Sequence, residues 1–199
     1  MGAPFAGLVC RHRALAQRLI VRFCHGDIEV QFVRQLKRFL GLSGLLRRSL
    51  DGPEHDVTLA HEVEFLTDYL EIQKCRFGAR LLFSLDIAPE TDSALVPSML
   101  LQPLVENAVE HGVAQASHTT AVHIRSIREN DVLRLEVRDT GPGLSTDPCM
   151  LQNGVGLRNI RERLEHLYGP DGQLELLNDS PHGAVARITL PFCLAGRDR

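Results

Sequence analysis

The chain has 199 residues, 44% of them hydrophobic and 24% charged, which is typical of a soluble globular domain with or without a helical extension. Its formal net charge of −3 gives no electrostatic reason to expect a nucleic acid partner. The five cysteines are scattered, without a CxxC pair or zinc-ligand spacing. We therefore expect reduced thiols in a cytoplasmic protein rather than a disulfide framework.

The apolar segments do not predict a membrane span or a secretory signal. The longest one, Ala94–Val105, is interrupted by prolines and polar residues and is shorter than the about 18 residues a spanning helix needs. The N-terminal patch Gly2–Cys10 has no basic region before it and runs into Arg11-His12-Arg13.

Two amphipathic helices are predicted in the N-terminal part. Apolar residues recur at helical spacing from Phe32 to Leu46, and Asp51-Gly52-Pro53 ends that pattern. Thr58 is expected to cap the second helix, whose apolar face runs from Leu59 to Phe77. The periodicity leaves open whether these helices pack on each other or on a second copy of the chain.

After Arg80, strand-like alternation mixes with helical segments. Helices are predicted at Pro97–Gly112 and Leu157–Tyr168, and strands at Leu81–Ile87, Ala121–Ile127, Val132–Asp139, Gln173–Leu177 and Ala184–Leu190. Because no regular βαβ alternation is present, the pattern predicts an α+β fold, a two-layer α/β sandwich preceded by two helices.

Asp139 ends the predicted strand Val132–Asp139, on the same face as its apolar row. A buried carboxylate needs a partner, and Gly141 and Gly143 directly after it let a ligand approach the backbone closely. The amino group of adenine would satisfy the carboxylate. Asp139 capping its own backbone in a turn is the alternative.

Two further segments suggest a nucleotide site. Gly154, Gly156 and Leu157 open a helix, where backbone N–H groups and the helix dipole favour phosphate, although a simple loop is the alternative. The helix around Pro97–Gly112 carries a polar stripe of Glu106, Asn107, Glu110 and His111. Asn107 offers an oxygen ligand for Mg²⁺, and a neighbouring carboxylate can orient a water or hold the outer shell of the metal. The alternative is that the stripe is the solvated face of an ordinary amphipathic helix.

Together, these segments resemble the GHKL ATPases. LQPLVENAVEHG (101–112) resembles the N-box, RDTGPGL (138–144) the first glycine box and NGVGLRNIRERLEHLYG (153–169) the second. The segment VTLAHEVEFLTDYLEIQKCRFGARL (57–81) precedes these boxes. With it, the sequence of residues 32–192 is similar to those of the LytS-type sensor histidine kinases. The resemblance implies a partial dimerisation and phosphoacceptor-like segment at 1–78 and an ATP-binding catalytic domain at 79–195.

The resemblance also implies functional roles. Glu106, Asn107 and His111 would be catalytic and Asn107 would bind Mg²⁺, with Glu106 polarising in the same box. ATP would contact Asn107, Asp139, Gly141, Gly143, Gly154, Gly156 and Leu157. The γ-phosphoryl group of ATP would pass to a histidine and then to an aspartate of a response regulator. A homodimer through the N-terminal helices is implied as well, and intact members are often anchored in the inner membrane.

The phosphoacceptor motif departs from the family pattern. The family's PHFLFN-like run is absent, and Cys10–Gln17 stands in its place with His12 as a weak candidate acceptor. We therefore predict a truncated or degenerate copy with little self-phosphorylation. Two other functions stay open: a catalytically incomplete nucleotide-binding partner of another kinase, and a GHKL ATPase or serine kinase such as an anti-sigma-factor kinase.

Overall fold

A five-stranded mixed sheet forms one layer of the fold. The computed structural model describes residues 56–114, 116, 118–144 and 155–194. The strands follow the order β2-β4-β5-β7-β6, in which β2 and β4 are parallel and every other neighbouring pair is antiparallel. Their bounds are Leu81–Ile87 (β2), Thr120–Glu129 (β4), Val132–Asp139 (β5), Gln173–Asn178 (β6) and Ala184–Pro191 (β7).

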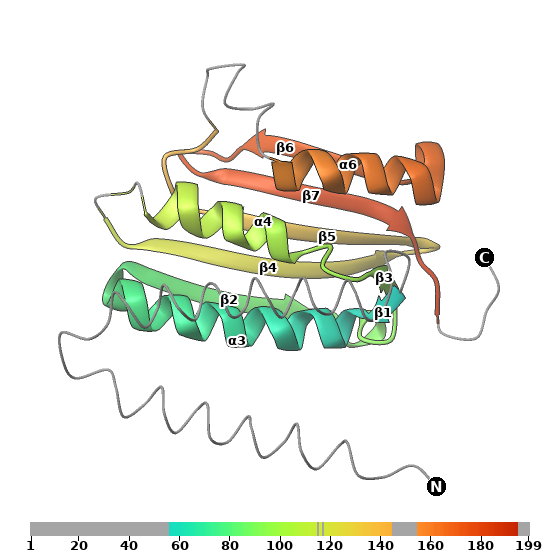
Figure 1. Cartoon of the computed structure of the whole chain (residues 1–199), viewed down its shortest axis with the longest axis horizontal. Coiled ribbons are helices and arrows are strands. Elements are labelled where there is room, and N and C mark those ends of the chain that lie inside the picture. The colour runs from blue at the N-terminus through green and yellow to red at the C-terminus, as the bar shows by residue number, and fades with distance from the viewer. Residues whose placement is uncertain (1–55, 115, 117, 145–154, 195–199) are drawn as a thin grey trace, which may run out of the picture. The chain divides into compact units, whose positions relative to one another are not determined.

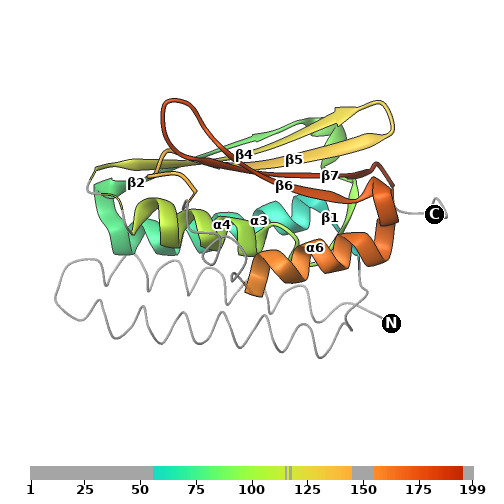
Figure 2. The same cartoon turned by 90° about the horizontal axis from the view of Figure 1, so that it is seen from above.

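Three helices cover one face of this sheet (Figures 1 and 2). They are α3 (Leu59–Phe77), α4 (Gln102–Asn107) and α6 (Val155–Tyr168), and α4 continues as a π-helical segment, Ala108–Val113. A short ladder pairs β1 (Asp56–Thr58) with β3 (Leu95–Pro97). Single 3₁₀ turns lie at Gly78–Arg80, Pro89–Thr91 and Gly169–Asp171. The predicted α+β two-layer sandwich is confirmed.

The core lies between the sheet and the helical layer. Alternate residues of each strand point inward, as the period of a half-buried strand requires. The largest fully buried side chains come from both layers: Leu59, Leu66, Leu70, Leu81, Leu100, Leu101, Leu104, Ile124, Leu133, Leu135, Leu164 and Ile188. Burying each such side chain contributes about 1.5–3 kcal/mol, so the apolar periodicity read from the sequence accounts for the layering.

Helix α3 belongs to the helical layer. Thr58 caps it as predicted, accepting a hydrogen bond from the His61 backbone N–H at 3.4 Å. Its buried face lies toward the sheet and α4, and the compact unit that contains the sheet begins at Asp51. The boundary at 78/79 stays a prediction about functional parts, and the first predicted helix, from Phe32 to Leu46, lies outside the described residues.

The helix predicted from Pro97 begins later. Leu95–Pro97 pairs with β1 as a strand, and Met99 adopts a left-handed backbone conformation with φ of 60°. The α-helix therefore starts at Gln102, although its far end reaches Val113, close to the predicted end. Among the described residues, no helix is both long and apolar enough to cross a membrane.

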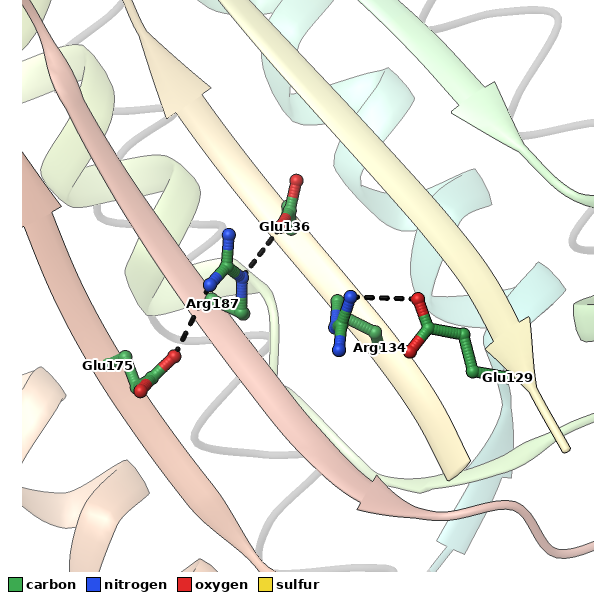
Figure 3. A network of polar contacts seen from close by, with 5 residues as sticks. All are labelled: Glu129, Arg134, Glu136, Glu175 and Arg187. Carbon is green, nitrogen blue, oxygen red and sulfur yellow. Dashed lines mark hydrogen bonds and ion pairs between the residues drawn. The ribbon is translucent and has the colours of Figure 1, made fainter. Parts of the chain in front are cut away.

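The outer face of the sheet carries a row of alternating charges, one from each strand. In register order the row is Asp86, Arg125, Glu136, Arg187 and Glu175. Arg125 Nε lies 3.0 Å from Asp86 Oδ2, and Arg187 Nε lies 2.7 Å from Glu136 Oε1. Figure 3 shows Arg187 between Glu136 and Glu175, with the separate pair of Arg134 and Glu129 beside it. We call the five residues in register, Asp86, Arg125, Glu136, Arg187 and Glu175, the charged row.

Candidate functional site

Asp139 is the buried carboxylate at the end of β5. It is only 7% exposed, and its Oδ1 accepts a hydrogen bond from the Gly141 backbone N–H at 2.9 Å. Burial raises the pKa of its carboxyl, while the backbone N–H groups of Gly141 and Ala184 and the charge of His111 oppose the rise. One carboxylate oxygen of Asp139 therefore makes the turn-capping hydrogen bond of the alternative interpretation. A further hydrogen-bond donor would still stabilise the ionised carboxylate.

Three glycines let separate segments converge on Asp139. A Cβ on Gly112 would lie 3.0 Å from Asp139 Oδ1, and one on Gly141 would lie 2.4 Å from Gly112 Cα. A Cβ on Gly183, whose φ is +111°, would lie 2.1 Å from the Asp139 carbonyl oxygen. Three segments therefore meet around Asp139: the end of the π-helical segment, the end of β5 and the β6–β7 turn. They approach so closely that a side chain at any of the three glycines would clash. Sequence reasoning singled out Gly141 but missed Gly112 and Gly183.

Gly143 is held by the end of β6. Its φ is +88°, and a Cβ there would lie 2.9 Å from Asn178 Oδ1. The same Asn178 oxygen accepts a hydrogen bond from the Leu144 backbone N–H at 2.8 Å. Asn178 therefore fixes the chain as it leaves the first glycine box, a contact between residues 34 apart that no local pattern announces.

The three predicted catalytic residues lie on the helix formed by α4 and its π-helical continuation. Asn107 is the last α-helical residue and is half-buried, while Glu106 accepts a hydrogen bond from Gln102 Nε2 at 2.8 Å. His111 is exposed, and its charge lowers the pKa of Asp139. The turn after Asn107 is wider than the α-helical turn assumed from the sequence, and such π-bulges occur frequently at functional sites.

The second glycine box lies against the same helix. Gly156 and Leu157 are in the first turn of α6, which starts two residues earlier than predicted. A Cβ on Gly156 would lie 3.2 Å from the Cβ of Pro103, so the beginnings of α6 and α4 are in close approach. Gly154 lies outside the described residues, as does His12. The N-box helix thus contacts both glycine boxes, the first at its end through Gly112 and the second at its beginning through Pro103.

Gly141→Ala is expected to destabilise the protein by about 1–3 kcal/mol and to weaken ATP binding, because the new methyl group must push Gly112 away from Asp139. Thermal unfolding and calorimetric titration with ATP measure the two effects. Gly169→Ala is the matched control: its φ of +56° is strained for alanine, but its Cβ meets nothing within 4 Å. That variant should lose stability only. Equal ATP affinity in both variants would contradict the close-approach argument.

Comparison with known proteins bears on the family of the chain. Residues 94–194 match the model of the histidine kinase-, DNA gyrase B- and HSP90-like ATPases, and residues 32–81 match a histidine kinase model. The sensor histidine kinase YesM of Bacillus subtilis is 34% identical over 154 residues, which cover 75% of this chain and 26% of YesM. The sensor histidine kinase/phosphatase LytS of Staphylococcus aureus is 29% identical, over 77% of this chain and 28% of LytS.

The fold agrees with a solved structure. The catalytic domain of the histidine kinase ThkA superposes with a TM-score of 0.56 at 18% identity, covering 71% of this chain and 98% of that domain. The chain spans about a quarter of the length of these two sensor kinases, 26% in the case of YesM and 28% in the case of LytS. From the family match and the converging motifs, we conclude that the chain belongs to the histidine kinase-, DNA gyrase B- and HSP90-like ATPases and carries the ATP-binding catalytic region of a sensor histidine kinase.

Proposed function

We propose that this chain binds ATP with Mg²⁺ and transfers the γ-phosphoryl group to a protein histidine, from which a response regulator receives it. The observation that carries the proposal is the buried Asp139 carboxylate, closely approached by Gly112 and Gly141. Its ionised form has a remaining acceptor capacity that the exocyclic amine of adenine fits. Gly141 and Gly143 shape the walls of this pocket.

Asn107 and Glu106 are the proposed residues at the phosphate end. Mg²⁺ usually keeps several waters and takes few protein ligands besides the substrate phosphates, so a single amide oxygen from Asn107 is an adequate contribution. In the described part of the chain, no three His, Cys, Asp or Glu side chains cluster as an all-protein metal cage would require. Glu106, held by Gln102, polarises the same region, and His111 adds charge near Asp139.

The glycine-opened start of α6 is proposed to meet the phosphates. Gly156 and Leu157 belong to the first described turn of α6, and the backbone N–H groups of a first helical turn favour phosphate. Gly154 would serve as a hinge before them. Phosphoryl transfer requires mainly positioning and charge neutralisation. In the reaction, the bond from the γ-phosphorus to the leaving oxygen of ADP breaks, a bond to the unprotonated imidazole nitrogen forms, and the ring releases the proton of its other nitrogen.

The acceptor and the assembly follow from the kinship with sensor kinases. We propose a homodimer through the N-terminal helices, with His12 as the weak candidate acceptor within this chain. A catalytically incomplete nucleotide-binding partner remains the second candidate function, because the PHFLFN-like run is absent from the sequence. A GHKL ATPase or serine kinase using the same pocket is the third.

Incubation with γ-labelled ATP tests the reaction. We expect ATP binding with little or no self-labelling, because no flanking Pro, Phe or Asn fixes the ring of His12 and a misplacement of about 1 Å can cost 100-fold. Acid and base treatment then identifies any label. An acid-labile label that disappears in His12→Gln would make His12 the acceptor, whereas an acid-stable label would indicate the serine kinase. Failure to bind ATP at all would refute the proposed function.

A further inference from the structure

The helix that carries Asn107 is capped at its beginning by a residue of α3. Leu101, at the N-cap position of α4, provides no side-chain hydrogen bond of its own. Glu62 of α3 fixes the residues at and just before that position: its carboxylate accepts hydrogen bonds from the backbone N–H groups of Met99 and Leu101. Glu62 is 7% exposed and lies 39 residues before Leu101 in the sequence.

The far end of the same helix is capped by a residue that follows α3. Arg80, in the 3₁₀ turn directly after α3, donates hydrogen bonds from Nη2 to the carbonyl oxygens of Val113 and Ala116, at 3.2 and 2.6 Å. Val113 is the last residue of the π-helical segment and Ala116 follows it, and a cationic side chain can satisfy the carbonyl groups at such a helix end. One continuous stretch of chain therefore supplies both caps.

The signs of the two charges match the dipole of the helix. An anion at the N-terminal end and a cation at the C-terminal end are both stabilising, and the effect is stronger at partly buried positions. Burial raises the pKa of the Glu62 carboxyl, while the N–H groups of Met99 and Leu101 and the charge of Arg163 oppose the rise. The carboxyl group therefore interacts with the N–H groups at this end of the helix and not with solvent.

Other residues extend the contact along the helix. The pKa of Tyr69, a buried residue of α3, is raised by its burial and by the charges of Glu106 and Glu110, which places the ring beside the Asn107 helix. One turn further along α3, Gln73 is fully buried, and neither of its amide atoms has a hydrogen-bond partner within the described residues. A buried amide without a partner costs free energy.

Helix α6 joins the same corner of the structure. Arg163 donates a hydrogen bond from Nη1 to the carbonyl oxygen of Ser98 at 2.6 Å, in the segment whose N–H groups Glu62 holds. The start of α4 is therefore fixed from two sides, by α3 and by the helix that follows the second glycine box.

From these contacts we propose that Glu62 and Arg80 are positioning residues, which hold the Asn107 helix by its two ends so that α3 sets the distance between the Mg²⁺-binding amide and Asp139. The inference rests on the proposed function, because it assigns the regulation of that same site. It also gives α3 a role in the reaction, because Glu62 of α3 and Arg80 directly after it contact the two ends of the helix that carries Asn107.

The test compares Mg-ATP binding with adenosine binding by calorimetry. Glu62→Gln keeps the size of the side chain but replaces one of its two acceptor oxygens by an NH2 donor, so that only one of the two backbone N–H groups can still be accepted. Arg80→Lys keeps the charge but loses the guanidinium group whose Nη2 reaches both carbonyl oxygens. We expect each variant to lose roughly tenfold or more in Mg-ATP affinity, the equivalent of one hydrogen bond to a charged group, with adenosine affinity within about twofold of the parent. Glu64→Gln, at an exposed position of α3, is the matched control and should change neither.

The outcomes separate the two proposals. A parent protein that does not bind Mg-ATP would refute the proposed function itself. With parent binding intact, unchanged Mg-ATP affinity in both variants would overturn the positioning role, and so would a parallel loss of adenosine affinity, which indicates a general disturbance of the fold. Should Glu62→Gln fail to fold, as judged by thermal unfolding, Arg80→Lys decides the question alone, because Arg80 lies at the surface.

Discussion

Asp139→Ala is expected to weaken ATP binding roughly 10- to 150-fold, the effect of removing one hydrogen bond to a charged group. The loss should be at the adenine end, since Asp139 lies at the end of β5 and the strand itself remains paired with β4 and β7. Isothermal titration with ATP measures the change. Asp86→Ala, which removes a carboxylate from the opposite face of the sheet, is the control and should leave the affinity unaltered.

The pH dependence of binding provides a second readout of Asp139. Burial raises the pKa of this carboxyl, so protonation, and with it the loss of ATP affinity, should begin at a higher pH than the about 3.9 of a free aspartate. In the nucleotide-free protein, the same raised pKa means that Asp139 contributes stability below its unfolded pKa, and that this contribution is lost as the pH rises through the folded value. Asp139→Ala should show neither dependence. A parent and variant with parallel pH profiles, or with equal ATP affinity, would remove Asp139 from the adenine site.

Asn107→Ala is expected to abolish the Mg²⁺ dependence of nucleotide binding while adenosine binding stays close to that of the parent. The reason is that Mg²⁺ demands near-octahedral oxygen ligation and takes few protein ligands, so the loss of one is severe. Titrations of ATP with Mg²⁺ and with a chelator measure the difference.

A second asparagine provides the control for Asn107. Asn130 lies in the β4–β5 turn with φ of 57°, and Asn130→Gly removes an amide there without straining the backbone. That variant should keep the full Mg²⁺ dependence. If Asn107→Ala also binds Mg-ATP as the parent does, the metal assignment of the N-box is wrong.

Local patterns predicted most of the sheet and the helical layer. The alternation of Leu133, Leu135 and Val137 gave the bounds of β5 correctly, because one face of that strand is buried along its whole length. The start of α4 was predicted wrongly at Pro97, because the pairing of β3 with β1 and the φ of 60° at Met99 depend on residues far away in the sequence. Periodicity within one segment contains no information on such pairings.

The candidate site was predictable only where its residues form motifs. Asp139 and Gly141 are neighbours in the sequence, and a carboxylate followed by glycines is a recognisable combination. Glu62 and Asn178, by contrast, act on backbone groups 39 and 34 residues away, and each looks like an ordinary helix or strand-end residue in isolation. Their roles come from tertiary proximity, which an amphipathic pattern does not specify.

The charged row has a consequence for how copies of this protein meet. Among the described residues, β2 and β6 are the edge strands of the five-stranded sheet, and an edge strand is a template for adding a strand from another molecule. The row has five members of alternating sign, so it ends in an acid at both edges, Asp86 on β2 and Glu175 on β6. Any extension of the sheet that continues the row, whichever edges join, places two carboxylates opposite each other, which is destabilising for a strand pair. Because the row has an odd number of alternating charges, it disfavours the edge-to-edge association of sheets from different copies of the protein.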